Sequence, residues 1–199
     1  IKDEVYNVSS QILGRPVVNA GLWLDDPDVD AVTRLFYPIQ VTGPSEEFQD
    51  RIACDIGTWA PFNSQNTALL KEVIPAYLLF PRIGRYDDIW ASYVVRHITD
   101  HMGDYVTYGS PLVRQKRNPH SFFQDFDDER LGLEHNDMFL GALGSCDLTG
   151  KSYRDCYVEI VEQFPNRISK VCNGANVSVD MFEPIITGMQ AWRDISIFA

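Results

Sequence analysis

The longest stretch of regular pattern, IWASYVVRHITDHMG at positions 89–103, constrains the fold most. Mainly apolar side chains recur there at the spacing of one helix face, namely Ile89, Tyr93, Val94, His97 and Ile98. Gly103 suits the left-handed position that ends many helices. Strand-like segments occupy 17–24 and 104–115, the second interrupted by Gly109. This alternation of strands and helices predicts an α/β fold.

Further helices are predicted on both sides of this region. After the first strand, an Asp- and Pro-rich segment predicts a turn and a helix start, with Asp28 or Asp30 as the cap. Residues 152–172 have an amphipathic helical pattern with Pro165 as a candidate break. Residues 180–195 predict a closing helix.

The composition limits the classes of partner. The 199 residues, 45% of them hydrophobic, suffice for one sizeable core, and we expect a single domain over 1–199. The net charge of −11 repels phosphate backbones and anionic lipids, so no nucleic acid partner and no lipid docking are expected. The sequence contains no apolar run long enough to predict a membrane span. A nucleotide diphosphate would need a divalent cation to bridge it to an acidic site.

The cysteines indicate a compartment. Cys54, Cys146, Cys156 and Cys172 form no CxxC pair and match no zinc spacing. They predict reduced thiols in a reducing compartment, the cytoplasm, with a Cys156–Cys172 bridge left open. No signal peptide is visible, and the chain starts at Ile1 without a methionine.

Two adjacent carboxylates, Asp87 and Asp88, stand where a glycine-containing loop meets the start of the long helix. The helix dipole and the free amides stabilise negative charge there, so the pair can act as a general base or as metal ligands. The alternative is a helix cap, with one carboxylate capping and the other solvated. Arg85 and Trp90 flank the pair as candidate substrate-binding residues, and Trp90 or Trp59 offers a ring on which a sugar can stack.

Residues 56–78 predict a strand, a polar turn and a short helix that Pro75 closes. The turn holds consecutive amide and hydroxyl side chains, Asn63, Ser64, Gln65, Asn66 and Thr67, of which the first four are candidate substrate-binding residues. Amides donate and accept hydrogen bonds together, which suits sugar hydroxyls. A polar turn with a helix cap is the alternative.

A basic island, Arg114-Gln115-Lys116-Arg117, stands out in this acidic chain. Arg114 and Arg117 can neutralise a diphosphate leaving group. His120 is a candidate ligand for a divalent metal or for phosphate, and a lone surface histidine is the alternative. The charged segment 116–137 predicts a loop that enters a helix.

Other patterns carry less chemistry. Asp26-x-Asp28 and Asp28-x-Asp30 are DxD patterns that can hold a divalent ion for a nucleotide sugar, but the intervening proline and the helical pattern favour a turn and cap. His97 and His101 have a metal-binding spacing without a zincin motif, so we interpret them as a packed helix residue and as compensation of the helix dipole. No P-loop, GxGxxG or GxSxG motif is present.

In this order, these segments resemble the reversibly glycosylated polypeptides, the UDP-arabinopyranose mutase family. The matching stretches are GLWLDDPDVDAVTRL (21–35), PFNSQNTALLKEVIPAYLLF (61–80), IGRYDDIWASYVVRHITDHMGDYVTYGSPLV (83–113) and CYVEI through MQAWRDI (156–195). The IGRYDDIWA stretch is the most specific, because it is long and ungapped. The RNPHS segment also fits a looser relationship to uncharacterised glycosyltransferases.

The resemblance implies a partial GT-A-like fold, a mixed sheet flanked by helices, of which this chain is the acceptor-side, C-terminal half. The nucleotide-binding half with its acidic metal-binding triplet is not in this chain. By this comparison Asp87 and Asp88 stand at the catalytic acidic pair of inverting GT-A enzymes, and His120 corresponds to a late metal- or phosphate-contacting histidine. The arginine that is glycosylated in the mutases lies just before GLWL, near Arg15.

The leading hypothesis is therefore sugar transfer from a nucleoside-diphosphate sugar, such as a UDP-sugar, to a carbohydrate or other hydroxyl acceptor, with Mn²⁺ or Mg²⁺. Asp88 or Asp87 would deprotonate the acceptor hydroxyl, while the metal and the basic island stabilise the departing diphosphate. A nucleotide-sugar mutase, which interconverts ring forms, is the first alternative. A non-catalytic carbohydrate-binding or assembly subunit of a homo- or hetero-oligomer is the second.

Overall fold

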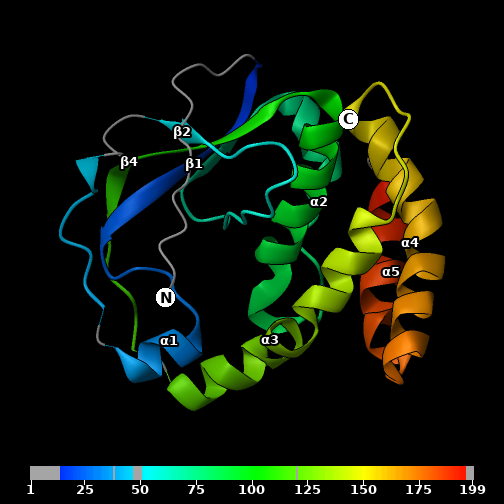
Figure 1. Ribbon diagram of the computed structural model, residues 1–199. Coiled ribbons are helices and arrows are strands. Elements are labelled where there is room, and N and C mark those ends of the chain that lie inside the picture. Colours follow the sequence, from blue (N-terminus) through cyan, green and yellow to red (C-terminus); the bar gives the residue numbers. More distant parts are fainter. Residues whose placement is uncertain (1–13, 38, 47–50, 120, 196–199) are drawn as a thin grey trace.

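The computed structural model describes residues 14–37, 39–46, 51–119 and 121–195. One mixed sheet has the strand order β2-β4-β1-β3. The long strands β1 (Pro16–Asp25) and β4 (Tyr105–Gln115) run parallel, and the short strands β3 (Thr67–Leu69) and β2 (Ile52–Ala53) pair antiparallel with β1 and β4. Parallel neighbours need a crossover connection, which here passes through a helix. The expected α/β fold, a mixed sheet flanked by helices, is confirmed, and it is consistent with a partial GT-A-like fold (Figure 1).

Both predicted long strands are present, but their ladder is irregular. The register shifts between Pro16 and Val18 and again between Gly21 and Trp23. At the second point β1 advances by two residues while β4 advances from Gly109 to Val113. The interruption predicted at Gly109 is therefore a bulge-like irregularity within a continuous strand.

The long helix α2 (Asp87–Met102) follows the prediction closely. Gly103 ends it with a left-handed backbone at φ 69°, as expected for a glycine at this position. Most of its side chains are buried, because α2 lies between the sheet and the outer helices α4 (Tyr153–Ala175) and α5 (Glu183–Ile195) (Figure 1). Arg96 is fully buried as well and donates to backbone carbonyls of the loop before Trp59.

Several predicted details differ from the structure. The strand expected at the start of 56–78 is absent, because Ile56 and Gly57 form a turn there, and β3 begins at Thr67, the last residue of the polar turn. Pro75 lies inside a 3₁₀ helix, η2 (Lys71–Ala76), which it does not close. Pro165 does not break α4, whose buried face holds the helix continuous through it.

Two of the remaining helices begin at the lower edge of the molecule in Figure 1. Helix α1 (Ala31–Phe36) begins after Asp30, whose carboxylate accepts the backbone N–H of Thr33 at 2.8 Å, so this cap prediction is confirmed. Helix α3 (Phe122–Gly144) begins after Ser121 and packs against α1 and α4. The 3₁₀ helix η4 (Val179–Phe182) precedes α5.

Two further expectations concern a disulfide bridge between Cys156 and Cys172 and the absence of a membrane span. Cys156 and Cys172 are free thiols several turns apart on α4, too far along one helix to form a bridge. Among the described helices, none has the length and apolar character that a membrane crossing requires.

Candidate functional site

The loop that carries the acidic pair is fixed against α3. The short 3₁₀ helix η3 (Gly84–Tyr86) runs directly into α2. Gly84 has φ 72°, and a Cβ there would lie 1.9 Å from the carbonyl oxygen of Asp128 on α3. Only glycine fits this close approach without a shift of the backbone. The start of α2 is thereby placed next to the N-terminal half of α3.

The two adjacent carboxylates have different surroundings. Asp87 Oδ1 accepts the backbone N–H of Asp88 at 2.9 Å, within the first turn of α2. Burial raises the pKa of Asp87 above its usual range. Asp88 Oδ2 instead accepts the backbone N–H of Ser64 at 2.7 Å and its hydroxyl at 3.0 Å. Asp87 therefore serves the helix start, while Asp88 joins α2 to the polar turn.

Asp88 lines a small pocket of about 180 Å³, which we call the Asp88 pocket. Its wall combines carboxylate, phenol and amide groups, contributed among others by Asp28, Tyr86, Tyr93 and Asn136. Burial raises the pKa of Tyr86 to about 12 and also raises the pKa of Tyr93, so both phenols stay neutral at pH 7. Neutral hydroxyl and amide groups beside a carboxylate are suited to bind the hydroxyls of a sugar.

Two side chains of the polar turn converge on Asp28. Gln65 Nε2 donates to Asp28 Oδ2 at 2.8 Å, and Asn63 Nδ2 lies 3.3 Å from the same oxygen. Asn63 is buried, whereas Gln65 is exposed. These amides thus hold a carboxylate that is part of the pocket wall, and act on the site through Asp28.

Asn66 supports the sheet at its irregular point. Its side-chain Nδ2 donates to the Leu22 carbonyl at 2.9 Å, and its carbonyl accepts the Gly21 N–H at 2.8 Å. Ser64 contacts Asp88, as described above. The expected polar turn is therefore present, and its side chains link the acidic residues to β1.

Arg85 lies among three carboxylates. Its Nε is 3.0 Å from Glu129 Oε1, and its two terminal nitrogens lie 3.4 Å from Asp28 and 3.7 Å from Asp125. Glu129 and Asp125 are almost fully buried on α3. The other oxygen of Glu129 accepts the backbone N–H of Ala31 at 2.6 Å, at the start of α1. Arg85 therefore ties the β1–α1 loop, η3 and α3 together.

The basic island is also close to carboxylates. Arg117 lies 3.6 Å from Asp28 and 3.9 Å from Asp125, with its side chain 9% exposed. Burial and the neighbouring arginines lower the pKa of Arg117. Arg114 is largely exposed and pairs with Asp25 at 2.9 Å. The structure thus brings Arg117 to the site and leaves Arg114 at the surface, both already beside negative charge.

Trp90 and His120 have no described place in the pocket. Trp90 is fully buried, stacks on Phe139 at 4.4 Å between ring centres and donates its indole N–H to Asn136. Its ring therefore has no free face for a ligand, although it orients Asn136 in the pocket wall. His120 lies outside the described residues.

The helical histidines are used in packing, as predicted for His97. Burial lowers the pKa of His97, its Nε2 lies 3.0 Å from the Cys146 carbonyl, and its ring stacks on Trp59. His101 Nε2 lies 3.0 Å from the Gly150 carbonyl, near the C-terminus of α2. Each imidazole thus has a carbonyl partner.

Arg15, near which the resemblance places the glycosylated arginine, lies far from the acidic pocket along β1. It pairs with Glu72 at 2.6 Å and with Asp104 at 3.2 Å, where β1 begins. Asp28 follows the other end of the same strand. Arg15 therefore contributes to the anchoring of β1.

The described residues do not fit a divalent-metal site. No three His, Cys, Asp or Glu side chains among them are arranged to hold an ion. The carboxylates that gather near the pocket, Asp28, Asp125 and Glu129, are opposed by Arg85 and Arg117. We therefore assign no step to a metal, and the expectation of Mn²⁺ or Mg²⁺ stays a prediction.

Sequence reasoning missed part of this site. The sequence pattern favours a turn or cap role for Asp28, whereas in the structure it is the carboxylate on which the polar turn and both arginines converge. Asp125 and Glu129 received no role, although their i, i+4 spacing places them on one face of α3. In the sequence, this spacing of two carboxylates on one helix face was the feature that could have indicated a contact with arginines elsewhere in the chain.

Fold and pocket together define a mixed α/β protein with a carboxylate in a small polar pocket. The chain belongs to the reversibly glycosylated polypeptide family, whose profile matches residues 6–196. It is similar to UDP-arabinopyranose mutase 3 of Arabidopsis thaliana, 28% identical over 190 residues, and to probable UDP-arabinopyranose mutase 1 of Pisum sativum, 29% identical over 192 residues. Both alignments cover 90% of this chain, which spans about half the length of these curated relatives (50%).

Proposed function

We propose that this chain forms the sugar-holding part of a nucleotide-sugar mutase that acts on a UDP-linked pentose, with Asp88 as its acid–base group. The observation that carries the proposal is the position of Asp88 at the start of α2, where it lines a pocket whose wall also holds two neutral phenols, one amide, Arg85 and further carboxylates. The similarity to proteins named UDP-arabinopyranose mutases supports this choice of reaction.

The chemistry needs one group that takes up and returns a proton. In an arabinopyranose the ring closes through O5 and O4 carries a hydrogen, whereas in the furanose the ring closes through O4 and O5 carries the hydrogen. The C1–O5 bond breaks, the C1–O4 bond forms, and one proton moves from O4 to O5. A single carboxylate can accept that proton and give it back, and positioned acid–base groups of this kind contribute about 10²–10⁴ in rate.

Transfer to a separate acceptor hydroxyl is the second candidate, with the same residue as the base. A second pocket beside Asp28, described below, favours it, because transfer requires room for a second molecule next to the reacting sugar. In that reaction the acceptor oxygen forms a bond to C1, the C1–O bond to the diphosphate breaks and UDP leaves, and the proton taken by Asp88 from the acceptor hydroxyl passes to solvent.

The test is turnover of UDP-arabinopyranose, followed by chromatography of the furanose form, in the protein that carries this chain. Asp88→Asn keeps an oxygen that can accept the Ser64 N–H, so the fold is retained, but it removes the proton acceptor. We expect a loss of about 10²–10⁴-fold in kcat. Adding a sugar acceptor separates the two candidates, because only transfer yields a glycoside.

Asp87→Asn is the matched control. Its amide oxygen can replace the carboxylate as acceptor of the Asp88 N–H, and Asp87 is not part of the pocket wall. Turnover should persist in this variant. Full activity of Asp88→Asn together with loss of activity in Asp87→Asn would show that Asp87, and not Asp88, is the acid–base group. A calorimetric titration with UDP, with and without Mn²⁺, tests the metal expectation separately.

A further inference from the structure

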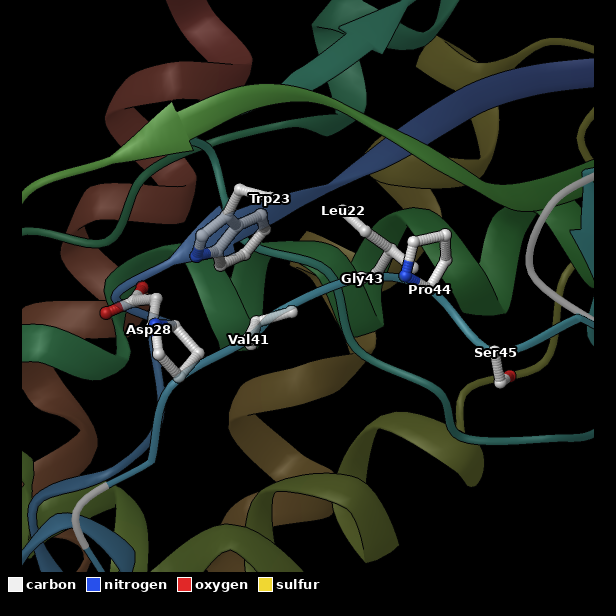
Figure 2. A pocket seen from close by; sticks show the side chains of 8 residues that line it. Leu22, Trp23, Asp28, Val41, Gly43, Pro44 and Ser45 are labelled. Carbon is white, nitrogen blue, oxygen red and sulfur yellow. The ribbon is translucent and has the colours of Figure 1, made fainter.

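A second pocket of about 270 Å³ lies on the other side of Asp28, and we call it the Trp23 pocket. Its wall is mainly apolar, formed by Leu22 and Trp23 of β1 and by Val41, Gly43 and Pro44 of the following loop (Figure 2). Asp28 belongs to this wall and also to the wall of the Asp88 pocket. The two pockets are therefore neighbours that share one carboxylate.

The Trp23 pocket is held by backbone pairing. The N–H groups of Asp25 and Val41 each donate to the carbonyl of the other at 2.9 Å, so the loop that contains Gly43 is fixed to the end of β1. Trp23 lies just beyond the register shift in the β1–β4 ladder. Irregularities of this kind often re-aim a side chain next to a functional site.

Trp23 and Asp28 are two residues of this wall with chemistry suited to a ligand. The indole ring of Trp23 contributes to the wall, and its buried Nε1 has no hydrogen-bond acceptor among the residues that the structure describes. The Asp28 carboxylate supplies an acceptor in the same wall.

These features select a class of ligand. A flat indole face packs against the C–H groups of a sugar ring, while a carboxylate accepts hydrogen bonds from its hydroxyls. The volume is close to the lower limit of about 300 Å³ for ligand pockets, which is room for one ring. The lining residues of the Trp23 pocket include no arginine or lysine, which disfavours phosphate groups.

We propose that the Trp23 pocket binds one neutral sugar ring, the unit next to the ring in the Asp88 pocket. Adjacent rings of an oligosaccharide are joined through a single oxygen, which matches two pockets that share one residue. The base and the sugar of a UDP-sugar are instead separated by a ribose and a diphosphate. The inference rests on the proposed sugar site at Asp88 and favours its second candidate, transfer, for which it names the acceptor as a carbohydrate.

The test is binding of arabinobiose, arabinose and uridine, measured by calorimetry. The disaccharide should bind at least about tenfold more tightly than the monosaccharide, because a second ring adds a stacked contact. Gly43→Phe should remove this difference by filling the pocket, since a Cβ at Gly43 meets no atom within 4 Å. Trp23→Ala should remove it by deleting the ring. Arabinose affinity should change in neither variant.

Gly141→Phe is the matched control, because Gly141 is also open but lies on the exposed side of α3. Trp23→Phe, which keeps one aromatic ring and loses the fused pyrrole ring with its N–H, covers the case in which Trp23→Ala does not fold, and it should weaken disaccharide binding less than Trp23→Ala. Equal affinities for arabinobiose and arabinose, or uridine binding that Gly43→Phe abolishes, would overturn the inference. Turnover that survives Asp88→Asn would instead refute the proposed function and leave the disaccharide result standing.

Discussion

Single residues decide how the site is assembled, and Asp28 is the main example. It follows β1 without belonging to a helix or strand, yet it contacts Gln65 from the polar turn, Arg85 from η3 and Arg117 from the basic island. A carboxylate with two cations and two amides around it is held by several contacts at once. These contacts position it where both pockets meet.

Gly84 sets the position of the acidic pair, and its replacement tests this. Gly84→Ala introduces a Cβ at 1.9 Å from the Asp128 carbonyl, on a residue with φ 72°. We expect a loss of about 1–3 kcal/mol from overpacking, with a further cost of about 1–2 kcal/mol for the left-handed backbone. Urea unfolding measures it. Gly141→Ala, in open space on α3, should stabilise by about 0.5–1 kcal/mol, and equal effects of the two would contradict this account.

At the scale of elements, charged contacts hold α1 and α3 together. Helix α1 is too short to be stable alone, and its first amide is satisfied by Glu129 of α3. Arg85 then neutralises Glu129 and Asp125. The orientation of α3, and with it the wall of the Asp88 pocket, depends on this network.

Arg85→Met should therefore destabilise the chain strongly. Removing one partner of a buried pair typically costs about 3–5 kcal/mol, and the partial exposure of Arg85 places its cost at the lower end. Arg114→Met removes an exposed pair with Asp25 and should cost less than about 1 kcal/mol. Guanidinium unfolding of both variants provides the comparison. A loss as small for Arg85→Met as for Arg114→Met would show that the network is not structural.

The uninterrupted course of α4 through Pro165 carries a second prediction at this scale. A proline in a helix interior loses one backbone hydrogen bond, which costs about 3 kcal/mol relative to alanine. Pro165→Ala should raise the melting temperature, measured by circular dichroism. Pro184→Ala serves as control, because Pro184 lies in the first turn of α5, where an N–H has no helical partner. A rise for Pro184→Ala alone would contradict this explanation.

Elements with a long stretch of regular apolar pattern were predictable from the sequence, whereas contacts between distant segments were not. The pattern of Ile89, Val94 and Ile98 fixed the course of α2, and Gly103 fixed its end. The acidic pair was found from its place before that pattern, but the different roles of Asp87 and Asp88 depend on Ser64, which the fold brings from another segment. Helical period alone carries no information on such pairings.

At the scale of the whole molecule, one apolar core runs from the sheet through α2 to α4 and α5. It encloses Cys146, Cys156 and Cys172, and Cys54 lies in a loop at its edge. The four thiols are free. The predicted cytoplasmic location and the predicted oligomer stay predictions, as does the activity of a chain that spans half of its relatives.

Thiol labelling tests how tightly this core is closed. In the native chain Cys54 should react with Ellman's reagent, slowly because burial raises its pKa, while the other three thiols react only on unfolding. The rates are read by absorbance with and without urea. Cys54→Ser should abolish the native reaction. Rapid native labelling of all four thiols would show a core that opens easily.

Because Asp28 lines both pockets, a ligand in one pocket can affect binding in the other. A ligand that draws the Asp28 carboxylate toward the Trp23 pocket would loosen its contacts with Gln65 and Arg85, and so alter the Asp88 pocket. Reciprocity requires that occupancy of the Asp88 pocket changes affinity at Trp23 by the same factor. Through this one side chain, the affinity for one ring of a substrate would depend on whether the neighbouring ring is bound.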